Sequence, residues 1–466
     1  MWFRREVWVR RCPCIAAVVA VAFAGLLSAC HDMSPRDYYI FGQPQASHPA
    51  TQAPQQLPPT GPQTETAPPG APLEPVVPEG TLPPVTAPAA RPVVALLLPL
   101  SGPNAGLGRA LLDAASLATF DIGGDSFVLL PRDTAGTPEG AASAAQSAIA
   151  AGARMIVGPL FAAEVPAVAG VARPANVNIV SLSNDRTVAG PGVFVIGLSP
   201  QGQIERVVGF AASRGLHSFA ALVPNNSFGS VVEDAFRRSI QATGSNIALI
   251  DHYDPGADAT PVVRRLAGYA GRVANAPSSR GGFQEGDDDA ARDQSQPATA
   301  PVAAGSGGLD AVLLPDFGDR LLSIAPLLPY YDVDPAQVRF LGTALWEDPR
   351  VTREPALNGG WFAAPPPAAR ADFVKRYQGV YGQAPPRLAT LAYDATALAA
   401  VLARGPNGPD FSAEAIGNPN GYAGTDGIFR FRSDGTAERG LAVLEVQRDG
   451  FKVISPAAED FRDITR

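Results

Sequence analysis

The sequence predicts an α/β fold of two lobes, each built on a mainly parallel sheet. Between Val93 and Leu314, short apolar runs alternate with stretches of helical pattern. Strands that are apolar throughout are typical of parallel sheets that carry helices on both faces. The runs form two successive sets, which indicates two sheets and therefore two lobes.

The first set begins with Val93–Leu98, a continuous apolar run. The glycine-rich turn Ser-Gly-Pro-Asn-Ala-Gly-Leu-Gly and an Ala/Leu-rich stretch follow it, which is the order of strand, turn and helix. The predicted strands of this set are 93–98, 127–130, 155–157 and 179–182, and the predicted helices are 109–120, 141–151 and 165–172.

The second set follows a strand predicted at 193–196. Its predicted helices are 203–214, 231–243 and 262–269, and its predicted strands are 219–223, 247–250 and 311–314. The C-terminal part has a different pattern. Its apolar runs 429–431, 441–446 and 451–454 are separated by Ser-Asp-Gly-Thr and Arg-Asp-Gly, which predicts antiparallel strands around two Asp-Gly turns.

Composition excludes several classes of function. The 466 residues carry a formal net charge of −8 and only 17% charged side chains, so neither a nucleic-acid-binding surface nor a charge-driven disordered chain is expected. The three cysteines are Cys12, Cys14 and Cys30. Disulfides, cysteine-bound metals and thiol nucleophiles are therefore not expected after Cys30.

The N-terminus has the pattern of a secretion signal. Arginines precede an apolar run from Cys14 to Leu27, which is shorter than the roughly 20 residues that span a bilayer. Leu-Ser-Ala-Cys at 27–30 resembles the bacterial lipobox, which implies removal of residues 1–29 and lipidation of Cys30. His31 stands where lipoproteins of the inner membrane usually carry Asp, so the resemblance implies the outer membrane. An ordinary cleavage site with an incidental cysteine is the alternative.

Two segments are predicted to be disordered. Residues 30–91 form the first, because Pro44–Pro92 holds fifteen prolines in 49 residues and no aromatic side chain. Such a proline-rich tether reaches on the order of 150 Å. The second is an insertion at 275–308, whose acidic residues lack the alternating ligand spacing of a calcium loop.

The sequence contains no recognisable catalytic motif. No Gly-x-Ser-x-Gly or His-Glu-x-x-His occurs, and residues three before Lys375 and Lys452 are aspartates, so Ser-x-x-Lys is absent too. His217 and His252 flank predicted strands and are expected to be structural or surface residues. The turn after Leu98 lacks both phosphate-loop and dinucleotide glycine patterns. We therefore predict a protein that is not an enzyme and has no cofactor or metal.

Three motifs occur in an order that resembles a known family. They are Val93–Pro103 with its Leu-Leu-Pro-Leu-Ser-Gly, Val-Gly-Pro-Leu at 157–160, and Gly-Leu-Ser-Pro at 197–200 before a helix. This order resembles the type I periplasmic-binding-protein fold of leucine-binding proteins. The resemblance implies two Rossmann-like lobes with mainly parallel sheets and a three-crossing hinge.

Within that fold the chain is most similar to the penicillin-binding-protein activator lipoproteins. Asp394 in Leu-Ala-Tyr-Asp-Ala and the stretch Gly424–Arg432 also resemble that family. The resemblance implies a periplasmic lipoprotein that stimulates a peptidoglycan synthase, a penicillin-binding protein. The best-known activators carry a helical-repeat domain where this chain has its proline-rich tether. The alternative is the solute receptor of an importer for branched-chain or other amino acids.

The resemblance also implies how the chain divides between lobes. Lobe 1 is expected at 92–200 and 343–410, and lobe 2 at 201–342 and 411–466. The crossings between them are expected near Gly197–Gly202, near Gly342 and Thr343, and between Gly405 and Gly424.

Candidate ligand-binding residues follow from the carboxyl ends of the predicted strands, where open parallel sheets bind ligands. An amino acid would use hydroxyls such as Ser101 and Ser183 for its carboxylate, and Asp316 or Asp319 for its ammonium. The alternative is that these polar groups cap turns and helices and satisfy their own backbone. The candidates are Ser101, Gly102, Leu160, Phe161, Ser181, Ser183, Asn184, Asn225, Asn226, Phe228, Asp316, Phe317 and Asp319.

Overall fold

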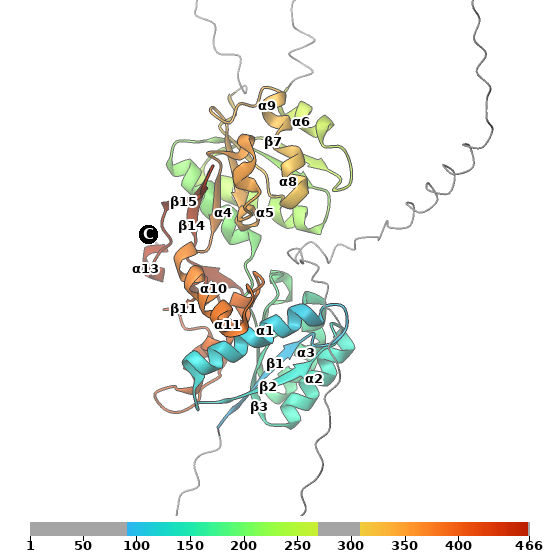
Figure 1. The fold of residues 1–466 in the computed structure, drawn as a ribbon, viewed down its shortest axis with the longest axis vertical. Coiled ribbons are helices and arrows are strands. Elements are labelled where there is room, and N and C mark those ends of the chain that lie inside the picture. Colours follow the sequence, from blue (N-terminus) through green and yellow to red (C-terminus); the bar gives the residue numbers. More distant parts are fainter. Residues whose placement is uncertain (1–90, 269–307, 465–466) are drawn as a thin grey trace, which may run out of the picture. The chain divides into compact units, whose positions relative to one another are not determined.

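The computed structural model describes residues 91–268 and 308–464. The predicted signal peptide, Cys30 and the tether up to residue 90 lie outside the described residues, as does the predicted insertion apart from Gly308. Figure 1 shows the described part as two groups of helices packed on sheets. The α/β architecture predicted from the apolar runs is confirmed.

The first sheet has five strands in the order β2-β1-β3-β4-β5, and every neighbouring pair is parallel. Its central strands coincide with apolar runs of the sequence. Helices cover both faces of this sheet, so the side chains on both faces are buried, and apolar side chains are buried at low cost. The strands are β1 (Val93–Leu98), β2 (Val128–Asp133), β3 (Ala153–Val157), β4 (Asn178–Ser181) and β5 (Val193–Val195).

Helices cover both faces of the first sheet (Figure 1). On one face, alanines and valines of α2 and α3 pack against Ala95 and Leu97 of β1. On the other face, α1 packs against α11, and Tyr381 of α10 donates a hydrogen bond to the backbone of Asp113 in α1 at 2.8 Å. The helices are α1 (Ala105–Ala118), α2 (Pro138–Ala150), α3 (Val165–Ala172), α10 (Pro367–Tyr381) and α11 (Ala389–Ala403). We call this sheet with these helices the first lobe.

The second sheet has seven strands in the order β15-β14-β10-β9-β8-β6-β7. The strands from β10 to β7 are parallel to one another, and β14 and β15 add an antiparallel edge. The strands are β6 (Ser218–Pro224), β7 (Asn246–Tyr253), β8 (Ala311–Leu313), β9 (Arg339–Thr343), β10 (Trp361–Ala364), β14 (Ala442–Gln447) and β15 (Gly450–Ser455).

Apolar clusters on the two faces of this sheet form the core of the second lobe. One cluster joins the sheet to Ile204 of α4 and Phe236 of α5, and the other joins it to Val263 of α6 and Leu321 of α8. We call this sheet with these helices the second lobe. Its helices are α4 (Pro200–Ser213), α5 (Ser227–Thr243), α6 (Thr260–Leu266), α8 (Gly318–Ile324) and α9 (Leu327–Tyr330).

A small antiparallel sheet comes between β10 and β14 in the chain. It has the order β11-β12-β13 and lies beside the first sheet, because the backbone N–H of Val195 donates to Gly435 at 2.9 Å. The elements around it are α12 (Ala413–Ile416), β11 (Tyr422–Gly424), β12 (Gly427–Phe431), β13 (Ala437–Arg439) and the terminal α13 (Phe461–Ile464). Both predicted Asp-Gly turns join antiparallel strands, although the two hairpins belong to different sheets.

The chain crosses between the lobes at three places. The first lies between β5 and α4, where a crossing was expected near Gly197–Gly202. The crossing predicted near Gly342 and Thr343 is wrong, because β10 still pairs with β9 and buries Phe362 in the second lobe. The second crossing therefore follows Ala364. The third, predicted between Gly405 and Gly424, lies at Gly440 and Leu441, since β11–β13 stay with the first sheet.

Candidate functional site

The structure brings the predicted residues of the first lobe to one edge of its sheet. Ser101 and Gly102 follow β1, Leu160 and Phe161 follow β3, and Ser181 ends β4. These strands are parallel neighbours, so their carboxyl ends share an edge. Ser101 and Gly102 are exposed there, while Phe161 and Asn184 are half-buried.

The hydroxyls of Ser181 and Ser183 at this edge both contact nearby backbone groups. Ser181 is fully buried and donates to the carbonyl of Pro159 at 3.1 Å. The hydroxyl of Ser183, 4% exposed, accepts from the backbone N–H of Asp185 at 3.0 Å. Leu160 is buried as well. These contacts match the interpretation of the serines as turn residues better than a preformed carboxylate site.

Glu164, which the sequence analysis missed, ties two loops of this edge together. Its carboxylate accepts from the Thr134 hydroxyl at 2.9 Å and from the backbone N–H of Phe161 at 3.3 Å. Burial raises the pKa of Glu164 to about 7. A glutamate after two alanines is typical of an exposed helix start. Phe161 has no side-chain oxygen, so the sequence lacks the capping-box pattern that would have indicated this contact.

The wild-type protein is expected to lose stability as the pH rises from about 5 to about 8, and Glu164→Gln should reduce this loss. The reason is that the pKa of Glu164 is about 7 in the folded protein, against an ordinary value of 4.5. The folded protein holds this proton more tightly than the unfolded chain. Stability is therefore full below pH 4.5 and falls as pH rises through about 7. Thermal midpoints of both proteins measure the effect, with exposed Glu139→Gln as control. Parallel pH profiles for wild type and Glu164→Gln would contradict it.

In the second lobe, the predicted polar residues also bind neighbouring groups. Asn225 donates to Asp254 at 2.9 Å, and Asn226 accepts from the backbone N–H of Gly229, which caps α5. Asp319 pairs with Arg350 at 2.7 Å. Phe228 is buried in the core. Asn226 therefore caps a helix, while Asn225 and Asp319 join segments of the second lobe.

Asp316 is the most buried of the candidate polar residues in the second lobe. It is 6% exposed, and its carboxylate accepts a hydrogen bond from the hydroxyl of Tyr253. Burial raises the pKa of Asp316 to about 6. The guanidinium of Arg320 lies over the Tyr253 ring, 4.7 Å from its centre. An ammonium ligand would have to compete with Tyr253 for this carboxylate. Phe317 beside it is half-buried.

The motifs around Asp394 and Gly424 meet in a buried charge cluster. Asp394 accepts from the backbone N–H of Thr425 at 2.7 Å and lies 3.7 Å from Arg439. Asp426 pairs with Arg387 at 3.0 Å. Both aspartate side chains are 0% exposed. The cluster joins α11 to the β11–β13 sheet and has a structural role.

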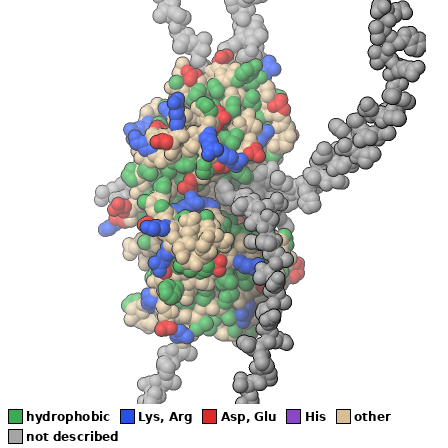
Figure 2. All heavy atoms as spheres, in the orientation of Figure 1, with side chains coloured by type: hydrophobic (Ala, Val, Ile, Leu, Met, Phe, Trp, Pro, Cys, Tyr) green, Lys and Arg blue, Asp and Glu red, His purple; other side chains and the backbone are tan. Residues whose placement is uncertain are grey.

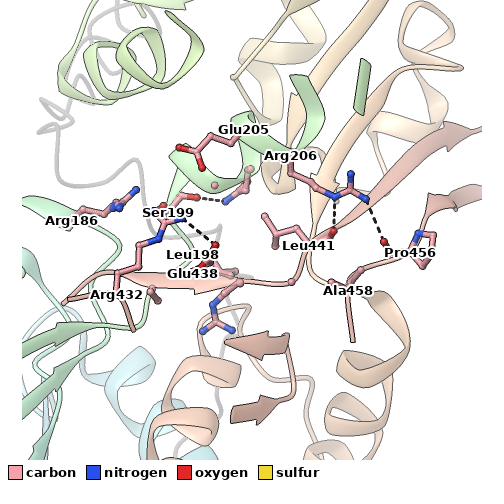
Figure 3. Close-up of a pocket in the computed structure, with 17 residues that line it drawn as sticks. Arg186, Leu198, Ser199, Glu205, Arg206, Arg432, Glu438, Leu441, Pro456 and Ala458 are labelled. Atoms are coloured by element: carbon pink, nitrogen blue, oxygen red, sulfur yellow. Dashed lines mark hydrogen bonds and ion pairs between the residues drawn. The ribbon is translucent and has the colours of Figure 1, made fainter. Parts of the chain in front are cut away.

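A cavity of about 580 Å³ lies at the crossings (Figure 3), and none of the predicted strand-end residues lines it. Segments far apart in the chain form it, which is why the sequence analysis missed it. We call it the crossing cavity. It is lined by Arg186, Gly197, Leu198, Ser199, Gly202, Gln203, Glu205, Arg206, Arg432, Ala437, Glu438, Arg439, Gly440, Leu441, Pro456, Ala457 and Ala458.

Within residues 91–268 and 308–464, no group of three or more His, Cys, Asp or Glu side chains is arranged to hold a metal ion. No helix of these two ranges is long and apolar enough to cross a membrane.

His252 contacts Glu233 at 2.8 Å. Figure 2 shows basic and acidic side chains interspersed on the face in view.

Comparisons with solved structures reproduce this architecture. A protein of Rhodospirillum rubrum assigned to a branched-chain amino acid ABC transporter is 19% identical, with a TM-score of 0.63 over 78% of this chain and 100% of that one. The Leu-, Ile-, Val-, Thr- and Ala-binding protein of Brucella ovis is 18% identical, with a TM-score of 0.55 over 80% and 93%. A solute-binding protein of Rhodopseudomonas palustris, solved with 3,4-dihydroxybenzoic acid, is 16% identical, with a TM-score of 0.53 over 79% and 98%.

Sequence comparison gives a consistent result. An uncharacterised protein of Rickettsia prowazekii is 21% identical over 178 residues, which are 38% of this chain and 47% of that protein. This chain thus spans about half the length of that curated relative. Residues 93–271 match the family model described as periplasmic binding protein. The chain therefore has the type I periplasmic-binding-protein fold, that of the leucine-binding proteins.

Proposed function

We propose that this chain is a non-catalytic lipoprotein that binds and stimulates a peptidoglycan synthase, a penicillin-binding protein. The observation that carries the proposal is that polar side chains at the strand ends already form hydrogen bonds within the protein. The Ser181 hydroxyl already donates to Pro159 and the Asp316 carboxylate already accepts from Tyr253, where a solute receptor needs available groups. Partners of this kind make a small-molecule site costly to form, because each displaced hydrogen bond must be replaced.

The motifs described above support the same proposal. Three motifs resemble the activator lipoproteins: Leu-Leu-Pro-Leu-Ser-Gly, Val-Gly-Pro-Leu and the motif around Asp394. Asp394 also accepts a hydrogen bond from Thr425 in the buried charge cluster described above. Lipidation at Cys30 and the proline-rich tether would place the folded part in the periplasm, on the inner side of the outer membrane. The tether would give it reach toward a synthase in the inner membrane.

The test measures glycan polymerisation by a purified bifunctional penicillin-binding protein from the same cell, with and without the full chain. We expect a saturable increase in rate and direct binding of the two proteins. The chain alone, and the chain with a synthase lacking its catalytic residues, should form no product. Absence of both binding and stimulation with every bifunctional synthase of the cell would overturn the proposal.

A second candidate function is that of a solute receptor for an importer. Its support is the fold shared with a protein named for binding Leu, Ile, Val, Thr and Ala. In this case Ser101 and Ser183 would bind a carboxylate, and Asp316 or Asp319 an ammonium group. Asp316 and Asp319 would first have to leave their present partners, Tyr253 and Arg350. Titration with amino acids separates the two functions.

A further inference from the structure

The crossing cavity is lined by residues of both lobes. Leu198 and Ser199 belong to the first crossing and Gly440 and Leu441 to the third. Arg186 comes from the first lobe, and Arg206 is on α4 of the second. An occupant would therefore contact both lobes and two of the three connections between them.

Arginines dominate the charged lining of this cavity. Four arginines and two glutamates line it, in a chain whose formal net charge is −8. Figure 3 shows Arg186 and Arg432 on the same side of the cavity as Ser199, with Arg206 across from them. The side chains of Arg186 and Arg432 are 21% and 40% exposed, so both are accessible to a ligand.

Acidic groups compensate part of the arginine charge in this lining. Glu205 also lines the cavity, and the carboxylate of Asp394 lies 3.7 Å from Arg439. Glu438 is shared between Arg430 at 2.7 Å and Arg432 at 3.3 Å. Arg186 donates to the Thr436 hydroxyl at 2.8 Å, and its carboxylate neighbour Asp434 is 3.9 Å away, beyond hydrogen-bond distance.

Arg206 is a further cation of the cavity lining, and uncharged oxygen atoms of the protein accept its hydrogen bonds. It donates to the carbonyl of Leu441 at 2.9 Å and to the Ser455 hydroxyl at 2.6 Å. Among the residues that the structure describes, no carboxylate forms an ion pair with it. Guanidinium groups bind carboxylates through paired, charge-assisted hydrogen bonds, so such a lining suits an anion.

The uncharged lining is mixed: Ser199 and Gln203 are polar, three residues are glycines, and the apolar side chains are Leu198, Ala437, Leu441, Pro456, Ala457 and Ala458. Apolar groups between separated cations favour an organic anion with a short hydrocarbon body over a bare inorganic ion. We propose that the crossing cavity binds a small organic dicarboxylate, held by Arg186 and Arg432 at one end and facing Arg206 at the other. Its binding is independent of the strand-end residues.

The experiment is calorimetric titration of the full chain with succinate, glutarate and citrate, and with neutral succinamide and inorganic phosphate for comparison. We expect saturable binding of at least one carboxylate, weaker binding of phosphate and none of succinamide. The double variant Arg186→Gln/Arg432→Gln should weaken carboxylate binding about tenfold or more. Exposed Arg237→Gln on α5 should leave it unchanged, since Arg237 does not line the cavity.

A second pair of variants tests the location without removing charge. Gly202 and Gly209 both lie on α4, and a Cβ added at either meets no atom within 4 Å. Gly202 lines the cavity and Gly209 does not. Gly202→Leu should therefore abolish carboxylate binding, and Gly209→Leu should preserve it. The proposal is overturned if no carboxylate binds saturably, if phosphate binds as tightly, or if the cavity variants bind like wild type. None of these outcomes depends on stimulation of a synthase.

Discussion

Replacing Arg439 with methionine is expected to lower the free energy of unfolding by about 3–5 kcal/mol. The Arg439 side chain is 5% exposed and lies 3.7 Å from the carboxylate of Asp394, which is 0% exposed. Its guanidinium also donates to the carbonyl of Ile196 at 2.9 Å, beside the first crossing. Methionine would fill much of the space but leave a buried carboxylate without its cation. Burial already raises the pKa of Asp394, and loss of Arg439 would raise it further.

Equilibrium unfolding in urea measures this loss, with Arg237→Met as the matched control. Arg237 is half-exposed and pairs with Glu233 one turn away, so its replacement should change stability by about 0.5 kcal/mol or less. Adding Asp394→Asn to Arg439→Met should recover part of the loss, because it removes the unpaired charge. A loss below about 1 kcal/mol for Arg439→Met would show that the cluster is not electrostatically coupled.

Trp346→Ala should cost a similar amount, about 3–5 kcal/mol. Trp346 is fully buried in the second lobe, at the end of the short helical turn η7 (Ala344–Trp346) that follows β9. Its indole N–H donates to the carbonyl of Leu314 at 3.0 Å. The ring also occupies the space above Gly342, where a Cβ would lie 2.2 Å from it. Alanine would thus leave a cavity and an unpaired carbonyl between β8 and β9.

Trp346→Phe separates these two contributions. Phenylalanine keeps an aromatic ring beside Phe362, whose centre lies 6.2 Å from that of Trp346, but it loses the N–H. We expect its loss of stability to be clearly smaller than that of Trp346→Ala. Equal losses for both variants would mean that the hydrogen bond to Leu314, and not packing, dominates. An unchanged unfolding midpoint for Trp346→Ala would contradict the packing of the second lobe.

The sequence predicted the parallel sheets because their central strands are uninterrupted apolar runs, such as Val93–Leu98 and Phe219–Val223. It failed where a strand is short and its neighbours lie far along the chain. Trp361–Ala364 has only four residues, and its place is set by pairing with β9 and β14. The second crossing was therefore placed too early. Long-range pairing of this kind leaves little local signal.

The candidate site, like the fold, could be predicted only in part. The sequence correctly placed polar residues at strand ends, because the ends follow from the strands. It did not reveal whether Ser183 or Asp316 would be available, since their partners Asp185 and Tyr253 depend on loop geometry and packing. The crossing cavity could not be predicted from the sequence either, because it joins distant segments of the chain. Arg186, which lines it, contacts Thr436, 250 residues further along the chain.

The proposed function requires that this fold recognises a protein and does not bind an amino acid at its strand ends. Thermal unfolding of the full chain with each neutral amino acid, leucine, isoleucine and valine included, tests it most directly. A bound ligand at 100 times its dissociation constant would stabilise the protein by about 2.7 kcal/mol. We predict an unchanged midpoint with every one of them. A concentration-dependent rise with any of them, abolished by Asp316→Asn, would contradict the account and establish a solute receptor.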